Sequence, residues 1–361
     1  MKKNKNILIC PLDWGIGHAS RCIPIIEQLL RQKANVLVGA GGRTASFLKS
    51  CFPGIQIVPV EGYNIHYPSG GSMAVEMLRQ TPKLLRAIRR EHQQVSKIID
   101  AHNIHAVISD NRFGMWSPKT YSIYITHQVK ISAPGMMGIT EQLLHRFHNH
   151  YIQKYDECWI PDLPERPGLA GDLSHTATDG NCFFIGPQSR FNPALSSKNG
   201  ERYDLMVIIS GPEPQRSIFE KMVLDQLGRT NYKAIVLLGK PEAPEHSAYQ
   251  RRNVFIYPHL NTKKMQKAME SSSLIVSRPG YSSIMDMAVL GLQAAFVPTP
   301  GQTEQIYLAR LHHDQKHYFS TTQKAFDLEE LIRSSKNFEG LKIVPDHRVL
   351  HERVAQLLDR I

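Results

Sequence analysis

The sequence predicts an α/β fold made of two Rossmann-like, doubly wound domains with parallel sheets. Short apolar segments rich in β-branched residues alternate with segments of helical apolar spacing through both halves of the chain. This alternation is typical of strand–helix–strand units. A chain of 361 residues also exceeds the size that one ordinary core supports. We assign residues 1–187 to a first domain, 188–203 to a polar linker, 204–340 to a second domain and 341–361 to a C-terminal helix.

The composition is that of a soluble globular protein, with 42% hydrophobic and 21% charged residues. The apolar run at residues 7–10 is too short for a signal peptide, so we expect a cytoplasmic protein. The net charge of +11 suits an anionic membrane surface, a phosphorylated substrate or nucleic acid. Because no basic run is interleaved with aromatic residues, a nucleic-acid partner is not expected.

The first domain begins with a βαβ unit. Its predicted strand, loop, helix and second strand lie at residues 7–10, 11–18, 21–31 and 36–38. Gly15 and Gly17 in the loop suggest dinucleotide binding, but Ser20 occupies the third glycine position and no acidic residue closes the second strand. In the alternative interpretation, the glycines form a tight turn and His18 caps the helix.

Polar side chains follow the predicted strands of this domain. Further strands are predicted at 106–110 and 122–126, with the last one at Cys158–Asp162. The carboxyl ends of parallel strands face the ligand crevice of a doubly wound sheet. The polar residues at these ends, which we expect to line a site, are Asp13, His18, Asp110, Asn111, Arg112, His127 and Gln128.

A basic amphipathic segment precedes the strand predicted at 106–110. Residues 73–99 are predicted as one or two helices, broken near Pro82. Its Lys and Arg residues are at 79, 83, 86, 89, 90 and 97. Such a face is either a solvated surface or a contact with an anionic membrane. The apolar segment Ala133–Ile139 either forms an exposed tip that contacts lipid or packs within the core.

The second domain repeats the alternation. Strands are predicted at 205–209, 235–238, 254–257, 273–276 and 294–297, and helices at 217–227, 261–271 and 282–290. The loop Ser210–Arg216 and the turn Arg278–Gly280 each lead into a helix. Free N–H groups at a helix start, together with the helix dipole, bind anions.

The segment 277–305 carries the strongest chemical pattern. Ser282 and Ser283 add hydroxyl donors at the helix start, and Arg278 adds charge. Asp286 follows five residues after Tyr281, roughly 7–8 Å along the axis, about the span from a diphosphate to the ribose hydroxyls of a nucleotide. In the alternative interpretation, this is an ordinary capped helix followed by surface polar residues.

The order of residues in this segment resembles the donor-nucleotide motif of MurG-like GT-B glycosyltransferases. The shared pattern is Arg278-x-Gly280, Ser282, an acidic residue at 286, Gly291, Pro298 and a loop containing Gln305; Asp286 stands where Glu is more usual. Gly15-x-Gly17-His18 resembles the first loop of this family, and His127-Gln128 resembles its His-Glu-Gln element without the Glu. The resemblance implies a GT-B architecture, with two domains facing across a cleft and a C-terminal helix that crosses back to the first domain.

The resemblance also implies an activity: inverting, metal-independent transfer of a hexosyl or N-acetylhexosaminyl group from a UDP-linked sugar to an acceptor hydroxyl. It implies no cofactor beyond this co-substrate, and the sequence has no Asp-x-Asp motif. The acceptor is left open as a glycan, a lipid or a small molecule, with peripheral attachment to the inner membrane face. A nucleotide-sugar epimerase or hydrolase on the same fold is the alternative.

Site roles follow from the resemblance. His18 is the expected general base, with Asp13 and Asp110 as alternatives. Gly15, Gly17, Asn111, Arg112, His127 and Gln128 are expected on the acceptor side. The expected donor-binding residues are Ser210, Gly211, Gln215, Tyr257, His259, Arg278, Gly280, Ser282, Ser283, Asp286, Gln302, Glu304 and Gln305.

Overall fold

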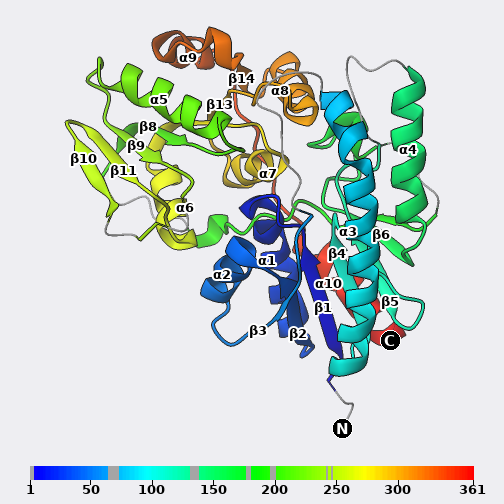
Figure 1. The fold of residues 1–361 in the computed structure, drawn as a ribbon. Helices are drawn as coiled ribbons and strands as arrows, with labels where there is room; N and C mark the ends of the chain where they lie inside the picture. The colour runs from blue at the N-terminus through cyan, green and yellow to red at the C-terminus, as the bar shows by residue number, and fades with distance from the viewer. Residues whose placement is uncertain are drawn as a thin grey trace. The chain divides into compact units, whose positions relative to one another are not determined.

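The structure is a computed structural model that describes residues 4–63, 73–130, 138–175, 180–195, 201–240, 243–244 and 247–361, excluding the side chains of 73–80 and 138–144. The chain forms two compact units (Figure 1). Unit 1 contains the described residues up to Ser189 together with Pro345–Ile361. Unit 2 contains the described residues from Arg190 to Val344.

Unit 1 is built on a parallel sheet of seven strands in the order β3-β2-β1-β4-β5-β6-β7. The strands are β1 (Asn6–Pro11), β2 (Asn35–Ala40), β3 (Gln56–Pro59), β4 (Ala106–Asp110), β5 (Tyr121–Ile125), β6 (Glu157–Ile160) and β7 (Cys182–Phe184). The chain leaves β1 toward β2 and β3, then returns to β4 on the other side of β1. The direction of winding therefore changes between β1 and β4.

Helices cover both faces of this sheet because alternate strand residues are apolar on each face. The helices are α1 (Ile16–Arg31), α2 (Gly42–Cys51), α3 (Met73–His102), α4 (Gly138–Ile152) and α10 (His347–Arg360). Ile7 and Ile9 pack with α1, α2 and the C-terminal helix α10. Leu8 and Cys10 face the other way, with Val95 and other residues of α3.

Unit 2 has a second seven-stranded sheet, in the order β10-β11-β9-β8-β12-β13-β14. Its strands are β8 (Tyr203–Ile208), β9 (Ala234–Leu237), β10 (Tyr249–Arg251), β11 (Val254–Tyr257), β12 (Ser272–Ser277), β13 (Ala294–Phe296) and β14 (Phe319–Ser320). All pairs are parallel except β10 with β11. Its helices are α5 (Gln215–Leu227), α6 (Thr262–Glu270), α7 (Tyr281–Leu290), α8 (Thr303–Asp314) and α9 (Leu328–Ser335). The winding changes direction between β8 and β12.

The structure confirms the α/β fold with doubly wound sheets and corrects several boundaries. Helix α1 begins at Ile16, so Gly17 and His18 lie in its first turn rather than in the loop. Helix α3 is continuous through Pro82. The strand predicted at Cys158–Asp162 is not the last of its sheet, because β7 pairs with it at the edge. Residues 133–137 of the predicted apolar tip lie outside the described residues.

Candidate active site

The first group of predicted site residues surrounds the change of winding in unit 1. The loop after β1 leads into α1, while β4, its neighbour in the sheet, ends at Asp110. Connections leave β1 and β4 toward opposite sides, which opens a crevice at the carboxyl ends of these strands. Gly15 precedes α1 with φ of 108°, a conformation that favours glycine. The turn directs the first turn of α1, which carries His18, to the end of β4.

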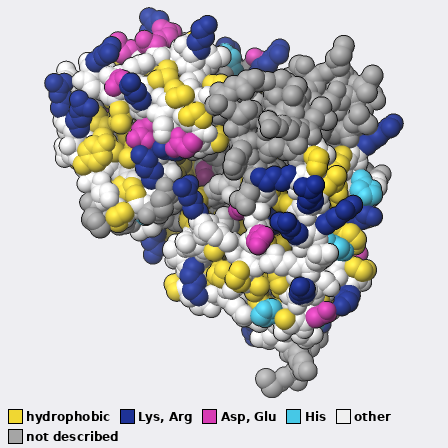
Figure 2. Space-filling view, in the orientation of Figure 1, with side chains coloured by type: hydrophobic (Ala, Val, Ile, Leu, Met, Phe, Trp, Pro, Cys, Tyr) yellow, Lys and Arg dark blue, Asp and Glu magenta, His cyan; other side chains and the backbone are white. Residues whose placement is uncertain are grey.

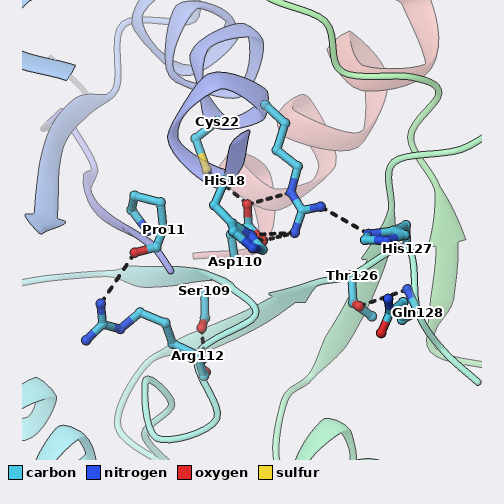
Figure 3. A network of polar contacts seen from close by, with 10 residues as sticks. Pro11, His18, Cys22, Ser109, Asp110, Arg112, Thr126, His127 and Gln128 are labelled. Carbon is cyan, nitrogen blue, oxygen red and sulfur yellow. Dashed lines mark hydrogen bonds and ion pairs between the residues drawn. The ribbon is translucent and has the colours of Figure 1, made fainter. Parts of the chain in front are cut away.

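His18 and Asp110 are in contact at this point. Nδ1 of His18 lies 3.1 Å from Oδ1 of Asp110, and the side chain of His18 is 18% exposed whereas that of Asp110 is fully buried. Figure 3 shows the two side chains directed toward one another. A carboxylate that accepts the Nδ1 proton leaves Nε2 of a neutral imidazole with its lone pair, which is what a general base needs.

A buried arginine that the sequence analysis did not select completes this group. Nε of Arg21 donates to Oδ2 of Asp110 at 2.6 Å, and its Nη2 donates to Oδ1. Nη2 also lies 2.9 Å from Nδ1 of His18, and Nη1 lies 3.1 Å from Nδ1 of His127. The spacing of three residues between His18 and Arg21 on one helix face was the available signal.

Asp110 is unsuited to the alternative role of general base. Burial alone would raise the pKa of its carboxyl group, but the charge of Arg21, the neighbouring His18 and their hydrogen bonds hold that pKa well below its usual range. A carboxylate that stays ionised in this way takes up a proton poorly. The structure therefore corrects the catalytic assignment of Asp110, which becomes a partner of His18.

Asp13 lies beside the same crevice, packed against the backbone at Gly62. A Cβ atom on Gly62 would lie 1.6 Å from Oδ2 of Asp13, so the carboxylate occupies the space that a side chain at residue 62 would need. Oδ1 of Asp13 is buried and has no hydrogen-bond partner within the described part of the chain. Asp13 thus stays a candidate for contact with a hydroxyl group.

Arg112 does not have the acceptor-side role that the sequence predicted. Its side chain is fully buried, and Nε donates to Oε1 of Glu91 on α3 at 2.7 Å. Its Nη atoms donate to the backbone oxygens of Pro11 and Glu61. The guanidinium therefore links α3 to the end of β1 and to the loop after β3. This correction has a physical reason, since an internal carboxylate satisfies the arginine in place of a ligand.

The remaining predicted residues of this group sit after β4 and β5. The backbone of Asn111 has φ of 55° and continues the ladder by donating to Ile125 at 3.1 Å. His127 is buried, and the backbone of Gln128 donates to Oγ1 of Thr126 at 3.0 Å (Figure 3). The structure therefore brings Asn111 and His127 next to the His18–Asp110 pair through β4 and β5.

The second group surrounds the change of winding in unit 2. The loop after β8, with Ser210 and Gly211, and the turn after β12 lie at the carboxyl ends of adjacent strands. Helix α7 begins at Tyr281 after Gly280 and ends at Gly291, which has the predicted left-handed conformation with φ of 63°. The first N–H groups of α7 therefore lie at the crevice of this sheet.

One stripe of α7 is partly exposed. Ser282, Ser283 and Asp286 are half-buried, whereas Ile284 and Met285 are buried. Residues 282 and 286 are four apart and so share a helix face. The structure thus places the two hydroxyl groups and the carboxylate on the face that the packing of α7 leaves accessible.

Arg278 does not point at this crevice as the sequence analysis expected. It is 1% exposed, and its guanidinium lies 4.2 Å from the ring centroid of Phe219. Nη1 donates to the carbonyls of Val297 and Pro298, and Nη2 donates to Gln215 and Gln323. Burial lowers the pKa of Arg278 to about 10, so it stays charged at neutral pH. Its role is to tie together the connections after β8 and β13.

Other predicted donor residues lie on the neighbouring connections. Oε1 of Gln305 accepts from the backbone of Thr299 at 2.8 Å and so orders the loop that leads to α8. Gln302 precedes α8, and Glu304 lies in its first turn. Oε1 of Gln215 accepts from Gln323 at 2.9 Å. The half-buried Tyr257 is the last residue of β11 and the half-buried His259 follows it, two strands away from β8 in the sheet.

Comparisons with known proteins agree with this arrangement. The model of the glycosyltransferase family 28 C-terminal domain matches residues 214–340. The chain is 23% identical over 324 residues to an uncharacterized glycosyltransferase of Methanosarcina acetivorans, covering 83% of this chain and 79% of that relative. It is 22% identical over 366 residues to a UDP-N-acetylglucosamine–N-acetylmuramyl-(pentapeptide) pyrophosphoryl-undecaprenol N-acetylglucosamine transferase of Finegoldia magna, covering 96% and 91%.

The fold is also found among solved structures. The crystal structure of the glycotransferase of kitacinnamycin matches with a TM-score of 0.64 at 12% identity, and the match covers 99% of both chains. That likeness establishes the fold, while the matched domain and the relatives establish the class of enzyme. The protein is therefore a glycosyltransferase with a GT-B fold, and its residues 214–340 match the family 28 C-terminal domain.

Proposed function

We propose that the enzyme transfers a hexosyl or N-acetylhexosaminyl group from a UDP-linked sugar to an acceptor hydroxyl, with inversion and without a metal ion. The observation that carries this proposal is the accessible stripe of α7, where the helix start, Ser282, Ser283 and Asp286 lie on one face at the crevice of the sheet. The Finegoldia magna relative, whose name includes a UDP-sugar, supports the choice of nucleotide.

The start of α7 binds the diphosphate in this proposal. Its free N–H groups and helix dipole favour negative charge, and they stabilise the charge that grows on the departing diphosphate. Asp286, one and a half turns further along, accepts hydrogen bonds from the ribose hydroxyls. Arg278 supports the site indirectly, by holding the loops beside the helix start.

His18 takes the proton of the acceptor hydroxyl. Asp110 holds the Nδ1 proton of His18, so that Nε2 accepts the acceptor proton as the new glycosidic bond forms and the bond from the anomeric carbon to the diphosphate breaks. Direct displacement by the hydroxyl inverts the anomeric centre. The configuration of the product, read by NMR from its anomeric coupling constant, tests this step, and retention would contradict it.

A thermal-shift screen with UDP-, GDP- and TDP-sugars tests the donor assignment. A ligand present at 100 times its dissociation constant adds about 2.7 kcal/mol to the free energy of unfolding. We expect UDP-sugars to raise the melting temperature most, and no response to any of the three nucleotides would refute the proposal. Release of UDP at turnover rates without an acceptor would instead indicate the epimerase or hydrolase alternative.

We further propose that the acceptor lies at an anionic membrane surface. Five basic residues on the outer face of α3 are exposed, namely Lys83, Arg86, Arg89, Arg90 and Lys97. Figure 2 shows Lys and Arg side chains gathered along α3. Each contributes about 1 kcal/mol of attraction near an anionic surface. Within the described residues, no helix combines the length and the apolar composition needed to cross a bilayer.

A further inference from the structure

Two cysteines lie side by side at one edge of the sheet in unit 1. Cys158 on β6 and Cys182 on β7 are partners in the register of these parallel strands. Partner residues on neighbouring strands direct their side chains to the same face of a sheet. The two thiols are in hydrogen-bond contact there, and all five cysteines of the chain are free thiols.

The spacing of these strands suits a disulfide bond. Neighbouring strands lie about 4.8 Å apart, and the Cα atoms of a disulfide bond are usually about 4.4–6.8 Å apart. Strand β7 has three residues and ends the sheet within the described part of the chain, so it pairs there with β6 alone. A short strand that is held from one side can move the small distance that bond formation requires.

The two thiols differ in their access to solvent. Cys158 is 1% exposed, within an apolar cluster that includes Tyr124 and Ile160. The hydrogen bond with Cys182, together with burial, raises the pKa of Cys158 well above its usual value, so this thiol keeps its proton at neutral pH. Cys182 is partly exposed. A small oxidant in solution therefore reaches Cys182 first.

We propose that Cys158 and Cys182 form a redox-active dithiol, which a peroxide converts into a disulfide bond between β6 and β7. The bond fastens the edge strand to the sheet by a covalent link in addition to its backbone hydrogen bonds. This modification site is separate from the candidate active site and does not depend on the proposed sugar transfer.

The oxidation proceeds in two steps. The thiolate of Cys182 attacks one oxygen atom of hydrogen peroxide, the O–O bond breaks, and Cys182 becomes a sulfenic acid. The hydroxide that leaves takes the proton that Cys182 lost and forms water. The sulfur of Cys158 then attacks the sulfur of Cys182, and the proton of Cys158 leaves with the hydroxyl group as a second water. Two electrons pass from the two sulfur atoms to the peroxide.

The other three cysteines are placed differently. Cys10 pairs with Ser109 of β4 in the strand register. Cys10 and Cys22 are buried in clusters on opposite faces of the sheet. Cys51 is the last residue of α2 and is partly exposed. Cys51 therefore serves as the control for exposure to the oxidant without a cysteine partner across a strand.

The test treats the folded, full-length protein with hydrogen peroxide and then maps its thiols. Free thiols are alkylated after denaturation, and the peptides are identified by mass spectrometry. We expect a disulfide-linked pair of peptides containing Cys158 and Cys182, which a thiol reductant separates again. The two thiols should disappear together, and faster than the thiol of Cys51. Hydrogen exchange of the backbone amides of β7 should slow in the oxidised protein.

Two variants separate the steps, and a third is the control. In Cys158→Ala the sulfenic acid of Cys182 has no thiol to react with, so dimedone, a reagent for sulfenic acids, should label Cys182. In Cys182→Ala the buried Cys158 should stay reduced under the same treatment. Cys51→Ser should form the disulfide bond as the wild type does. The mapping of the wild type needs no variant, so a variant that does not fold leaves the test intact.

Three results would overturn the proposal: no bond between Cys158 and Cys182 in the oxidised wild type, a bond that forms only after unfolding, or loss of the Cys51 thiol at the same rate. Unchanged hydrogen exchange in β7 would refute the fastening of the edge strand. None of these measurements uses sugar transfer, so failure of the proposed function would leave them unaffected.

Discussion

At the scale of single residues, the chemistry of unit 1 depends on a carboxylate that stays ionised in the protein interior. Asp110 is buried on β4, yet two donors from Arg21 and the ring of His18 satisfy both of its oxygens. The sequence pointed to His18 and Asp110 separately, because each follows a predicted strand. It could not show their contact, because strand order decides which ends become neighbours and β4 lies 95 residues or more beyond β1.

His18→Ala should slow sugar transfer by about 10²–10⁴-fold, because the acceptor proton loses its base. The affinity for UDP should stay unchanged, since His18 belongs to unit 1 and the proposed donor site to unit 2. Steady-state rates together with calorimetry of UDP binding measure both effects. Unchanged turnover would remove His18 from the mechanism.

Asp110→Asn should destabilise the protein by about 3–5 kcal/mol, because it leaves the buried Arg21 without its counter-ion. The pKa of Asp110 is lower in the folded chain, so its ionisation contributes stability at neutral pH. That contribution is lost as the pH falls below about 4, the ordinary value for Asp. Urea unfolding from pH 7 to pH 3 should therefore show the difference between wild type and variant shrinking, and a constant difference would contradict this account.

At the scale of elements, the bounds of the helices were easier to predict than the roles of the charged residues beside them. The end of α7 at Gly291 and its start near Ser282 followed from turn and capping residues. The two arginines were misassigned for one reason: sequence pattern shows charge but does not reveal an internal partner. Arg278 and Arg112 both satisfy backbone carbonyls in the interior. The edge strands β7 and β14 have three and two residues. Segments this short show no alternation of apolar and polar residues, so the sequence did not predict them as strands.

Helix α10 is linked to strands β5 and β6 of its own unit through a buried acid. Glu157 accepts from Trp159 at 2.7 Å and from Tyr121 at 2.9 Å, and Arg360 of α10 lies 3.1 Å away. Glu157→Ala should lower the free energy of unfolding by about 1–3 kcal/mol, because it leaves buried donors unpaired. Chemical denaturation measures this. Glu352→Ala, an exposed position on α10, is the control and should change stability by less than about 0.5 kcal/mol.

The basic face of α3 should attach the protein to anionic vesicles. Replacing Arg86, Arg89 and Arg90 with Glu should abolish co-sedimentation with vesicles that contain phosphatidylglycerol, because each basic residue contributes about 1 kcal/mol of attraction. Vesicles of phosphatidylcholine alone serve as the control. Equal binding to both kinds of vesicle, or no effect of the charge reversal, would leave α3 as an ordinary solvated face.

At the scale of the whole molecule, the candidate site residues of each sheet lie where the direction of winding changes. In unit 1 this point lies between β1 and β4, and in unit 2 between β8 and β12. The alternation of strands and helices predicted the fold class, since each parallel pair requires a crossover. It did not predict the antiparallel strand β10, whose polar residues are exposed at the sheet edge.

The claim on which the account depends is that α7 binds a nucleoside diphosphate through its start and Asp286. Isothermal titration calorimetry with UDP measures this directly, on the wild type, on Asp286→Ala and on the control Asp225→Ala, an exposed position on α5. We expect Asp286→Ala to weaken binding by about 10-fold or more, since hydrogen bonds to a charged group contribute about 1.5–3 kcal/mol. The control should bind like the wild type. No heat of binding in the wild type, or equal affinity in Asp286→Ala, would contradict the account.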